Sequence, residues 1–91
     1  MVTINLRAYE IVLKALANKR RFAIVEFLKK NGEATVGEIA ETIKLSFTST
    51  SKHLLILDKA DILIKDQRNK EVYYMVASDT SRLAKQILSE L

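Results

Sequence analysis

The residues with the clearest capacity for chemistry lie in one short stretch, SFTSTSKHLLIL, at positions 46–57. Hydroxyl groups crowd its first half, and a lysine and the only histidine of the chain follow them. Such groups hydrogen-bond base edges and phosphate oxygens. They do not suggest a catalytic centre, because no acidic partner or nucleophile accompanies the histidine in the sequence. The residues predicted to form a binding surface here are Ser46, Thr48, Ser49, Ser51, Lys52 and His53.

Helical geometry accounts for a stretch that is polar at its front and apolar at its rear. We expect Ser46 to cap a helix over residues 47–59. At 100° per residue its small polar side chains point mostly outward, where they allow close approach to the major groove of DNA. The alternative is that these hydroxyls are only helix caps and solvated filler. The residues expected to face the core or anchor the rear are Thr50, Leu54, Ile56 and Leu57.

Three further helices are expected before this one. Apolar residues at helical spacing predict helices over 5–17 and 19–30, the second capped by Asn18 and ended at Asn31 and Gly32. Thr35 and Glu38 have the spacing of a capping box, which predicts a short helix over 36–43. A short helix, a brief turn and a second helix form the helix-turn-helix pattern.

After Asp61 the apolar pattern changes from helical to alternating. Residues 62–64 and 72–76 are rich in β-branched and aromatic side chains, which predicts two strands. The polar segment KDQRNKE at 65–71 predicts a hairpin with an exposed basic tip. We expect Arg68, Asn69 and Lys70 to reach the minor groove or flanking phosphates, the alternative being a solubilising turn.

A last helix is expected over residues 80–90, capped by Ser78 or Asp79. The chain then reads as four helices, two strands and one helix. This order predicts an α+β, mostly α, winged helix-turn-helix fold, in a single domain over residues 1–91.

Composition is consistent with a small DNA-binding protein and excludes several other classes. Fifteen Lys and Arg residues against eleven Asp and Glu give a net charge of +4, which mildly favours a polyanionic partner. The chain has no cysteine, so disulfides, thiolate metal sites and cysteine nucleophiles are excluded. The sequence begins without a signal-peptide pattern and holds no membrane-length apolar run, so we expect a soluble, cytoplasmic protein.

Several motifs together resemble the ArsR-type winged-helix repressors. The similar segments are LKALANKRR, VGEIAETIKLS, SKHLLIL and EVYYMV, and the resemblance covers nearly the whole chain. It implies a homodimer on an inverted-repeat operator, with recognition helices in successive major grooves. It also implies a dimer interface formed by the first and last helices. The alternative is that the apolar residues of these two helices complete the core of one subunit. The predicted interface residues are Leu6, Tyr9, Leu83, Ile87 and Leu88.

The sequence departs from the metal-sensing members of that family. Thr35 and Gly37 stand at the positions that resemble a pair of metal-binding cysteines. The last helix brings Asp79 and Glu90 but no histidine, so we predict no metal site and no cofactor. Asp61 and Asn69 replace glycines that the family usually has after the recognition helix and at the wing tip.

The hypothesis that these patterns favour is a sequence-specific transcriptional regulator that binds double-stranded DNA. The resemblance implies that it acts as a repressor, which is the family's usual mode of action. The alternative is a winged-helix protein-interaction module without DNA binding, which the apolar Phe47 and Leu55 on the recognition helix would suit. An enzyme is the weakest hypothesis, since neither a phosphate loop nor paired carboxylates are present. The sequence does not identify an effector.

Overall fold

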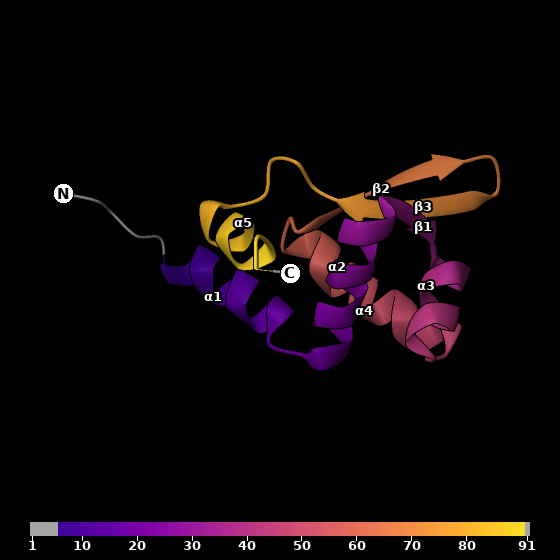
Figure 1. Ribbon diagram of the computed structural model, residues 1–91, viewed down its shortest axis with the longest axis horizontal. Coiled ribbons are helices and arrows are strands. Elements are labelled where there is room, and N and C mark those ends of the chain that lie inside the picture. Colours follow the sequence, from indigo (N-terminus) through magenta and orange to yellow (C-terminus); the bar gives the residue numbers. More distant parts are fainter. Residues whose placement is uncertain (1–5, 91) are drawn as a thin grey trace.

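The computed structural model describes residues 6–90 of the chain. The elements in chain order are α1 (Leu6–Leu16), α2 (Lys19–Asn31), β1 (Glu33–Thr35), α3 (Val36–Ile43), α4 (Phe47–Lys59), β2 (Leu63–Arg68), β3 (Glu71–Val76) and α5 (Arg82–Leu88). This order confirms the predicted winged helix-turn-helix fold and adds the short strand β1. In Figure 1, α1 and α5 lie together at one end of the molecule, and α3 and the tip of the β2–β3 hairpin lie at the other.

The helix boundaries follow from side chains that satisfy the free amides of each first turn. The Asn18 side chain accepts from the amides of Arg20 at 3.0 Å and Arg21 at 3.2 Å. Thr35 and Glu38 form the predicted capping box, in which each side chain accepts a hydrogen bond from the backbone amide of the other. These caps confirm the expected starts of α2 and α3.

Three antiparallel strands form a sheet in the order β1-β3-β2. Arg68 pairs with Glu71 across the hairpin, so only Asn69 and Lys70 form the turn. The predicted polar loop over 65–71 is therefore mostly strand. Its side chains are exposed on an edge strand, and the alternation that marks a half-buried strand is absent there. We call the β2–β3 hairpin the wing.

One hydrophobic core joins the helices to the sheet. It contains fully buried residues from α2, α3, α4 and the start of β2, and it extends to both α1 and α5. The largest of these side chains belong to Ile24, Leu28, Ile39, Leu54, Leu57, Ile62 and Leu63. Because α4 packs into this core along its rear, the direction of its exposed surface is fixed relative to the wing.

Turns between elements depend on residues with left-handed backbone conformations. Within residues 6–90, Lys44, Asp61 and Asn69 have φ near +58°, and Gly32 has φ +94°. Asp61 and Asn69 thus adopt the conformation expected where the ArsR-type pattern has glycine. Lys44 ends α3 and sets the turn into α4.

The last helix begins later than predicted. Ser81 is its cap and accepts from the Ala84 amide at 3.2 Å, so α5 starts at Arg82 and the prediction of Ser78 or Asp79 is wrong. All three residues are chemically suited to capping. Thr80, immediately before the cap, is buried in the domain.

Candidate nucleic-acid interface

α4 begins with a capped turn and an exposed polar surface. The Ser46 Oγ accepts from the Ser49 amide at 3.1 Å, which confirms the predicted cap. Thr48 and Lys52 are exposed, and Ser49 and Ser51 are half-buried. We call these four residues the helix front. Within residues 6–90 their side chains make no hydrogen bond or ion pair, so their polar groups are available to a ligand.

The rear of α4 is buried as the helical period predicts, with one exception. Thr50, Leu54 and Leu57 have no exposed surface. Ile56 is 42% exposed, so the prediction that it anchors the rear is wrong. Two residues beyond Leu54 the helix has turned by about 200°, which carries Ile56 away from the core.

Arg21 connects α4 to the end of α1 through hydrogen bonds. Its Nε donates to the Ala15 carbonyl at 2.6 Å, and its Nη2 donates to the Lys14 carbonyl at 3.1 Å. Its Nη1 lies 3.1 Å from the Nδ1 of His53 on α4. Since guanidinium has donors only, the His53 Nδ1 is the acceptor. Arg21 therefore stabilises the position of α4 through His53.

His53 is half-buried beside these positive charges. Burial, followed by the charges of Arg21 and Arg20, holds the pKa of His53 below its usual value of 6.5. The imidazole is therefore neutral near pH 7. With Nδ1 occupied as an acceptor, the proton is on Nε2. That N–H is the group through which His53 would meet a phosphate or base, as the sequence predicts.

The turn of the wing presents Asn69 and Lys70 to solvent. Asn69 has φ +57° at the first of the two central positions, as in a type II′ turn. The Lys70 ammonium has no ion-pair partner within residues 6–90. Lys65, further down the wing, lies 3.7 Å from the Asp58 carboxylate of α4. Lys70 is therefore the unpaired cation of this hairpin.

Arg68 does not match the expectation of a free basic tip. Its Nη1 and Nη2 donate to both carboxylate oxygens of Glu33 on β1, at 2.5 and 2.9 Å, and its Nε donates to Asp66 at 2.9 Å. The guanidinium also lies over the ring of Tyr73, 4.5 Å from its centre. The hydrogen bond from Arg68 lowers the pKa of Glu33, and the two carboxylates raise the pKa of Arg68.

The predicted dimer-interface residues fall into three levels of exposure. Leu6 is 75% exposed, Tyr9, Leu83 and Ile87 are half-buried, and Leu88 is buried in this chain's own core. Leu88 thus contributes to the core of one subunit. Two exposed α1 residues were not predicted as surface residues, namely Ile11 at 44% and Leu13 at 49%. The helical period of α1 places apolar residues on more than one face, so the sequence did not separate them.

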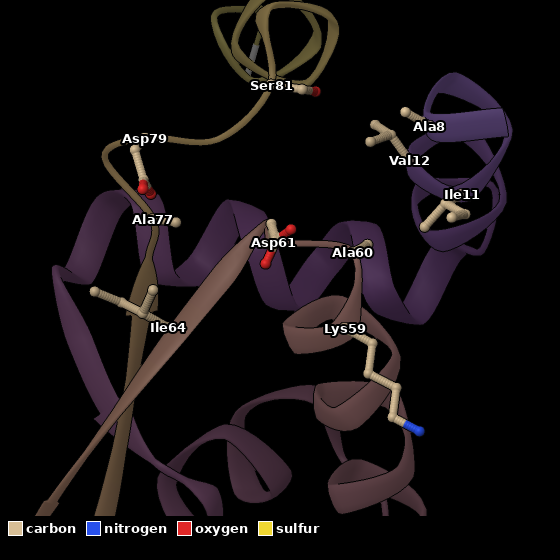
Figure 2. A pocket seen from close by; sticks show the side chains of 10 residues that line it. All are labelled: Ala8, Ile11, Val12, Lys59, Ala60, Asp61, Ile64, Ala77, Asp79 and Ser81. Atoms are coloured by element: carbon tan, nitrogen blue, oxygen red, sulfur yellow. The ribbon is translucent and has the colours of Figure 1, made fainter. Parts of the chain in front are cut away.

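A hollow of about 460 Å³ lies at the opposite end of α4 from the helix front (Figure 2). Ile11 of α1 and Ile64 of β2 line it, together with the carboxylates of Asp61 and Asp79. In Figure 2 the Lys59 side chain extends away from the other labelled residues. This apolar and acidic surface differs in character from the hydroxyl-rich helix front.

The four residues considered as metal ligands lie at the start of α3 and beyond the two ends of α5. Thr35 caps α3 and Gly37 lies in its first turn. Asp79 and Glu90 lie outside α5 on either side of it. Among residues 6–90 no three histidine or acidic side chains gather closely enough to hold a metal ion. In the same part of the chain, no helix has the length and apolar character needed to cross a membrane.

A family model for bacterial regulatory proteins of the arsR family matches residues 18–65. The matched region runs from the cap of α2 to the wing. Among similar proteins, the transcriptional repressor SdpR of Bacillus subtilis is 36% identical over 63 residues, which cover 69% of each chain. The transcriptional activator HlyU of Vibrio cholerae is 31% identical over 81 residues, covering 89% of this chain and 74% of HlyU.

Solved structures of similar proteins share the same architecture. HlyU from Vibrio cholerae superposes with a TM-score of 0.82 at 28% identity, covering 98% of this chain and 92% of that one. A homodimeric winged helix-turn-helix DNA-binding domain, Mb0332 from Mycobacterium bovis, gives a TM-score of 0.80 at 31% identity. That match covers 93% of this chain and 81% of the Mb0332 chain.

Proposed function

We propose that this chain, which belongs to the arsR family of bacterial regulatory proteins, regulates transcription as a homodimer bound to double-stranded DNA. The observation that carries the proposal is the unpaired helix front on a helix whose rear is fixed in the core. Small side chains let α4 enter the major groove closely, and their hydroxyls meet base edges or phosphates. The proposed contacts from α4 are Ser46, Thr48, Ser49, Ser51, Lys52 and His53.

The wing contributes contacts beside the helix. We propose that Asn69 and Lys70 meet the minor groove or flanking phosphates, because both are exposed at the turn and the Lys70 charge is unpaired. Arg68, whose charge faces two carboxylates, holds the wing against β1. A contact between Arg68 and DNA would require it to leave those carboxylates.

The proposed dimer interface lies on α1 and α5. These helices lie side by side at one end of the molecule, away from the wing tip (Figure 1). Leu6 and Leu13 are exposed there, and Tyr9, Leu83 and Ile87 are half-buried, which leaves apolar surface for a partner. The homodimeric state of Mb0332 supports this arrangement. A two-fold dimer would read an inverted repeat with half-sites about one helical turn apart.

The proposed mode of action is repression by occupation of a promoter. The names of the relatives include both a repressor and an activator, and the sign of regulation depends on where the operator lies. The family consists of transcriptional regulators, so we assign no reaction to the chain. We propose no metal, cofactor or effector, and we place the protein in the cytoplasm with its DNA.

A titration of fluorescent random-sequence duplex at 50 and 200 mM salt tests the proposal. Three to five phosphate contacts per subunit predict a slope of log affinity against log salt of about −5 to −9 for the dimer. The Thr48→Ala/Lys52→Ala variant, which removes two proposed contacts, should bind more weakly with a shallower slope. Absent or salt-insensitive binding by the wild-type protein would overturn the proposal.

A protein-interaction module is the second candidate. Phe47 and Leu55 of α4 are 61% and 46% exposed, and apolar side chains suit a protein partner. Recovery of a stoichiometric protein partner, together with no retention on DNA at either salt concentration, would favour this function.

A further inference from the structure

Phe47 is an apolar residue with an unusually large exposed surface. Its side chain is 61% exposed in the first turn of α4, although the domain has a well-formed core beneath that helix. Exposing an aromatic side chain forgoes the stabilisation that its burial would bring. The position immediately after the Ser46 cap is also the end of α4 that the proposed function directs into DNA.

Phe47 lies beside two hollows that residues of α3, α4 and the wing line. Two hollows, of about 240 and 510 Å³, both have Phe47, Val36 and Val72 in their walls. Val36 and Val72 are half-buried and pack against the core, so they form a firm apolar base beside the ring. Phe47 therefore lines both hollows while most of its surface stays exposed.

Polar and cationic groups surround this apolar ring. Lys70 lines one hollow, and Ser51, Lys65 and Gln67 line the other. Glu71 is an acidic member of the first hollow. An exposed ring among ammonium, hydroxyl and amide groups fits a polyanion that also carries small apolar groups. DNA is such a ligand, since each thymine places a C5-methyl group in the major groove, where phenylalanine contacts it.

A protein partner fits this surface less well. Protein interfaces have a contiguous apolar centre. The next exposed apolar residue in this direction is Leu55, eight residues further along α4, which is about 12 Å along the helix axis. The exposed polar residues Thr48 and Lys52 lie on the turns between them. The apolar surface around Phe47 is thus local and surrounded by polar groups.

We propose that Phe47 is a specificity-determining residue whose ring contacts the C5-methyl group of a thymine in each half-site. The proposal rests on the proposed function and adds the base that one side chain reads. It requires thymine at a fixed position of each half-site and weaker binding when that methyl group is removed.

The test uses duplexes selected for binding, in which deoxyuridine replaces thymine at one position at a time. This change removes the methyl group and leaves the hydrogen-bonding groups of the base unchanged. For wild-type protein we expect one position per half-site at which binding weakens about 4-fold, and about 15-fold when both half-sites are changed. Phe47→Ala should bind the unmodified duplex at least 10-fold more weakly and show no further loss with deoxyuridine.

Leu55→Ala is the matched control, because it shortens an exposed apolar residue on the same helix. It should retain the wild-type sensitivity to deoxyuridine. Circular dichroism should show that both variants fold, since neither side chain is buried.

Three outcomes would overturn the assignment of Phe47. The selected half-sites would lack thymine, wild-type binding would be indifferent to deoxyuridine at every position, or Phe47→Ala would keep the same deoxyuridine penalty. In each case salt-dependent binding to a selected duplex would leave the proposed function intact. Failure to select any duplex would instead contradict both proposals. If Phe47→Ala lost only the binding of a protein partner and kept its affinity for DNA, the ring would belong to a protein interface.

Discussion

The helix front and the wing carry similar polar and cationic residues, but the two regions differ in how many of these residues form contacts within the protein. Lys52 at the helix front and Lys70 at the wing turn have no partner within residues 6–90. Arg68, two residues before Lys70, donates to both Glu33 and Asp66 and lies over Tyr73. A basic residue near the tip of a wing is therefore not by itself a free positive charge.

The difference follows from the way each region is held. The helix front needs no side-chain support, because the rear of α4 is anchored by buried residues. The wing is anchored in the core by Leu63 and Tyr74, but β2 is exposed from residue 64 to the turn. The bidentate contact from Arg68 to Glu33 connects β2 to β1 across β3, and it offers a planar geometry that lysine would not reproduce.

The largest expected effect is that of Lys52→Ala on DNA affinity. A lost charged contact in each subunit should weaken duplex binding by about 10- to 100-fold. The salt slope should become shallower by about 1.8, since the dimer loses two phosphate contacts. Anisotropy titrations between 50 and 200 mM salt measure both. Lys59→Ala, which removes an exposed lysine at the other end of α4, is the control and should stay close to wild type.

The next effect concerns the wing and uses the double variant Glu33→Gln/Asp66→Asn. Removing both carboxylate charges releases the Arg68 guanidinium for phosphate, so duplex affinity should rise by about 3- to 10-fold. Adding Arg68→Ala to this background should abolish the gain. If Arg68→Ala in the wild-type background weakened binding as much as Lys70→Ala, Arg68 would already be a DNA contact and the comparison would fail.

A smaller effect is expected in the turns that position the two regions. Lys44, before α4, adopts φ +58° without the freedom of glycine. Lys44→Gly should raise the free energy of unfolding by about 0.5–1 kcal/mol, because relief of the left-handed strain exceeds the entropy that glycine adds to the unfolded chain. Urea denaturation measures this change. Asn69→Gly should give a smaller gain in the free energy of unfolding, since asparagine tolerates this conformation. If Lys44→Gly left the free energy of unfolding unchanged or lowered it, no strain would be relieved.

The smallest effect is a pH dependence that arises from His53. Its folded-state pKa is lowered, so the folded protein binds this proton less readily than the unfolded chain. The resulting stability is complete above pH 6.5 and is lost as the pH falls through the folded-state pKa. Thermal unfolding between pH 5 and 8 should show this loss in wild type and a flatter profile in His53→Asn, whose side-chain oxygen can take the place of Nδ1 as the acceptor for Arg21. Identical profiles would remove His53 as the cause.

The sequence predicted most of the features that depend on near neighbours, although it missed the Ser81 cap of α5 and the exposure of Ile56. The caps at Asn18, Ser46 and Thr35 each satisfy amides within three residues, so the order of residue types was enough to find them. The burial of Thr50 and Leu54 followed from the period of one helix. For the same reason the start of α4 and the direction of the helix front were predictable.

Features that depend on distant residues were not predictable from the sequence. Arg68 and Glu33 are 35 positions apart, and Arg21 and His53 are 32 positions apart. These pairs form only after the sheet and the helices have packed. The strand β1 is three residues long, too short for an alternating pattern, and it is defined by its pairing with β3.

Selection and sequencing of randomised duplexes that bind the protein, at two salt concentrations, tests the central claim most directly. The account predicts an enriched inverted repeat with half-site centres about 10 base pairs apart, recovered less efficiently at the higher salt concentration. Lack of enrichment at both concentrations would contradict the claim that the helix front of a dimer reads DNA.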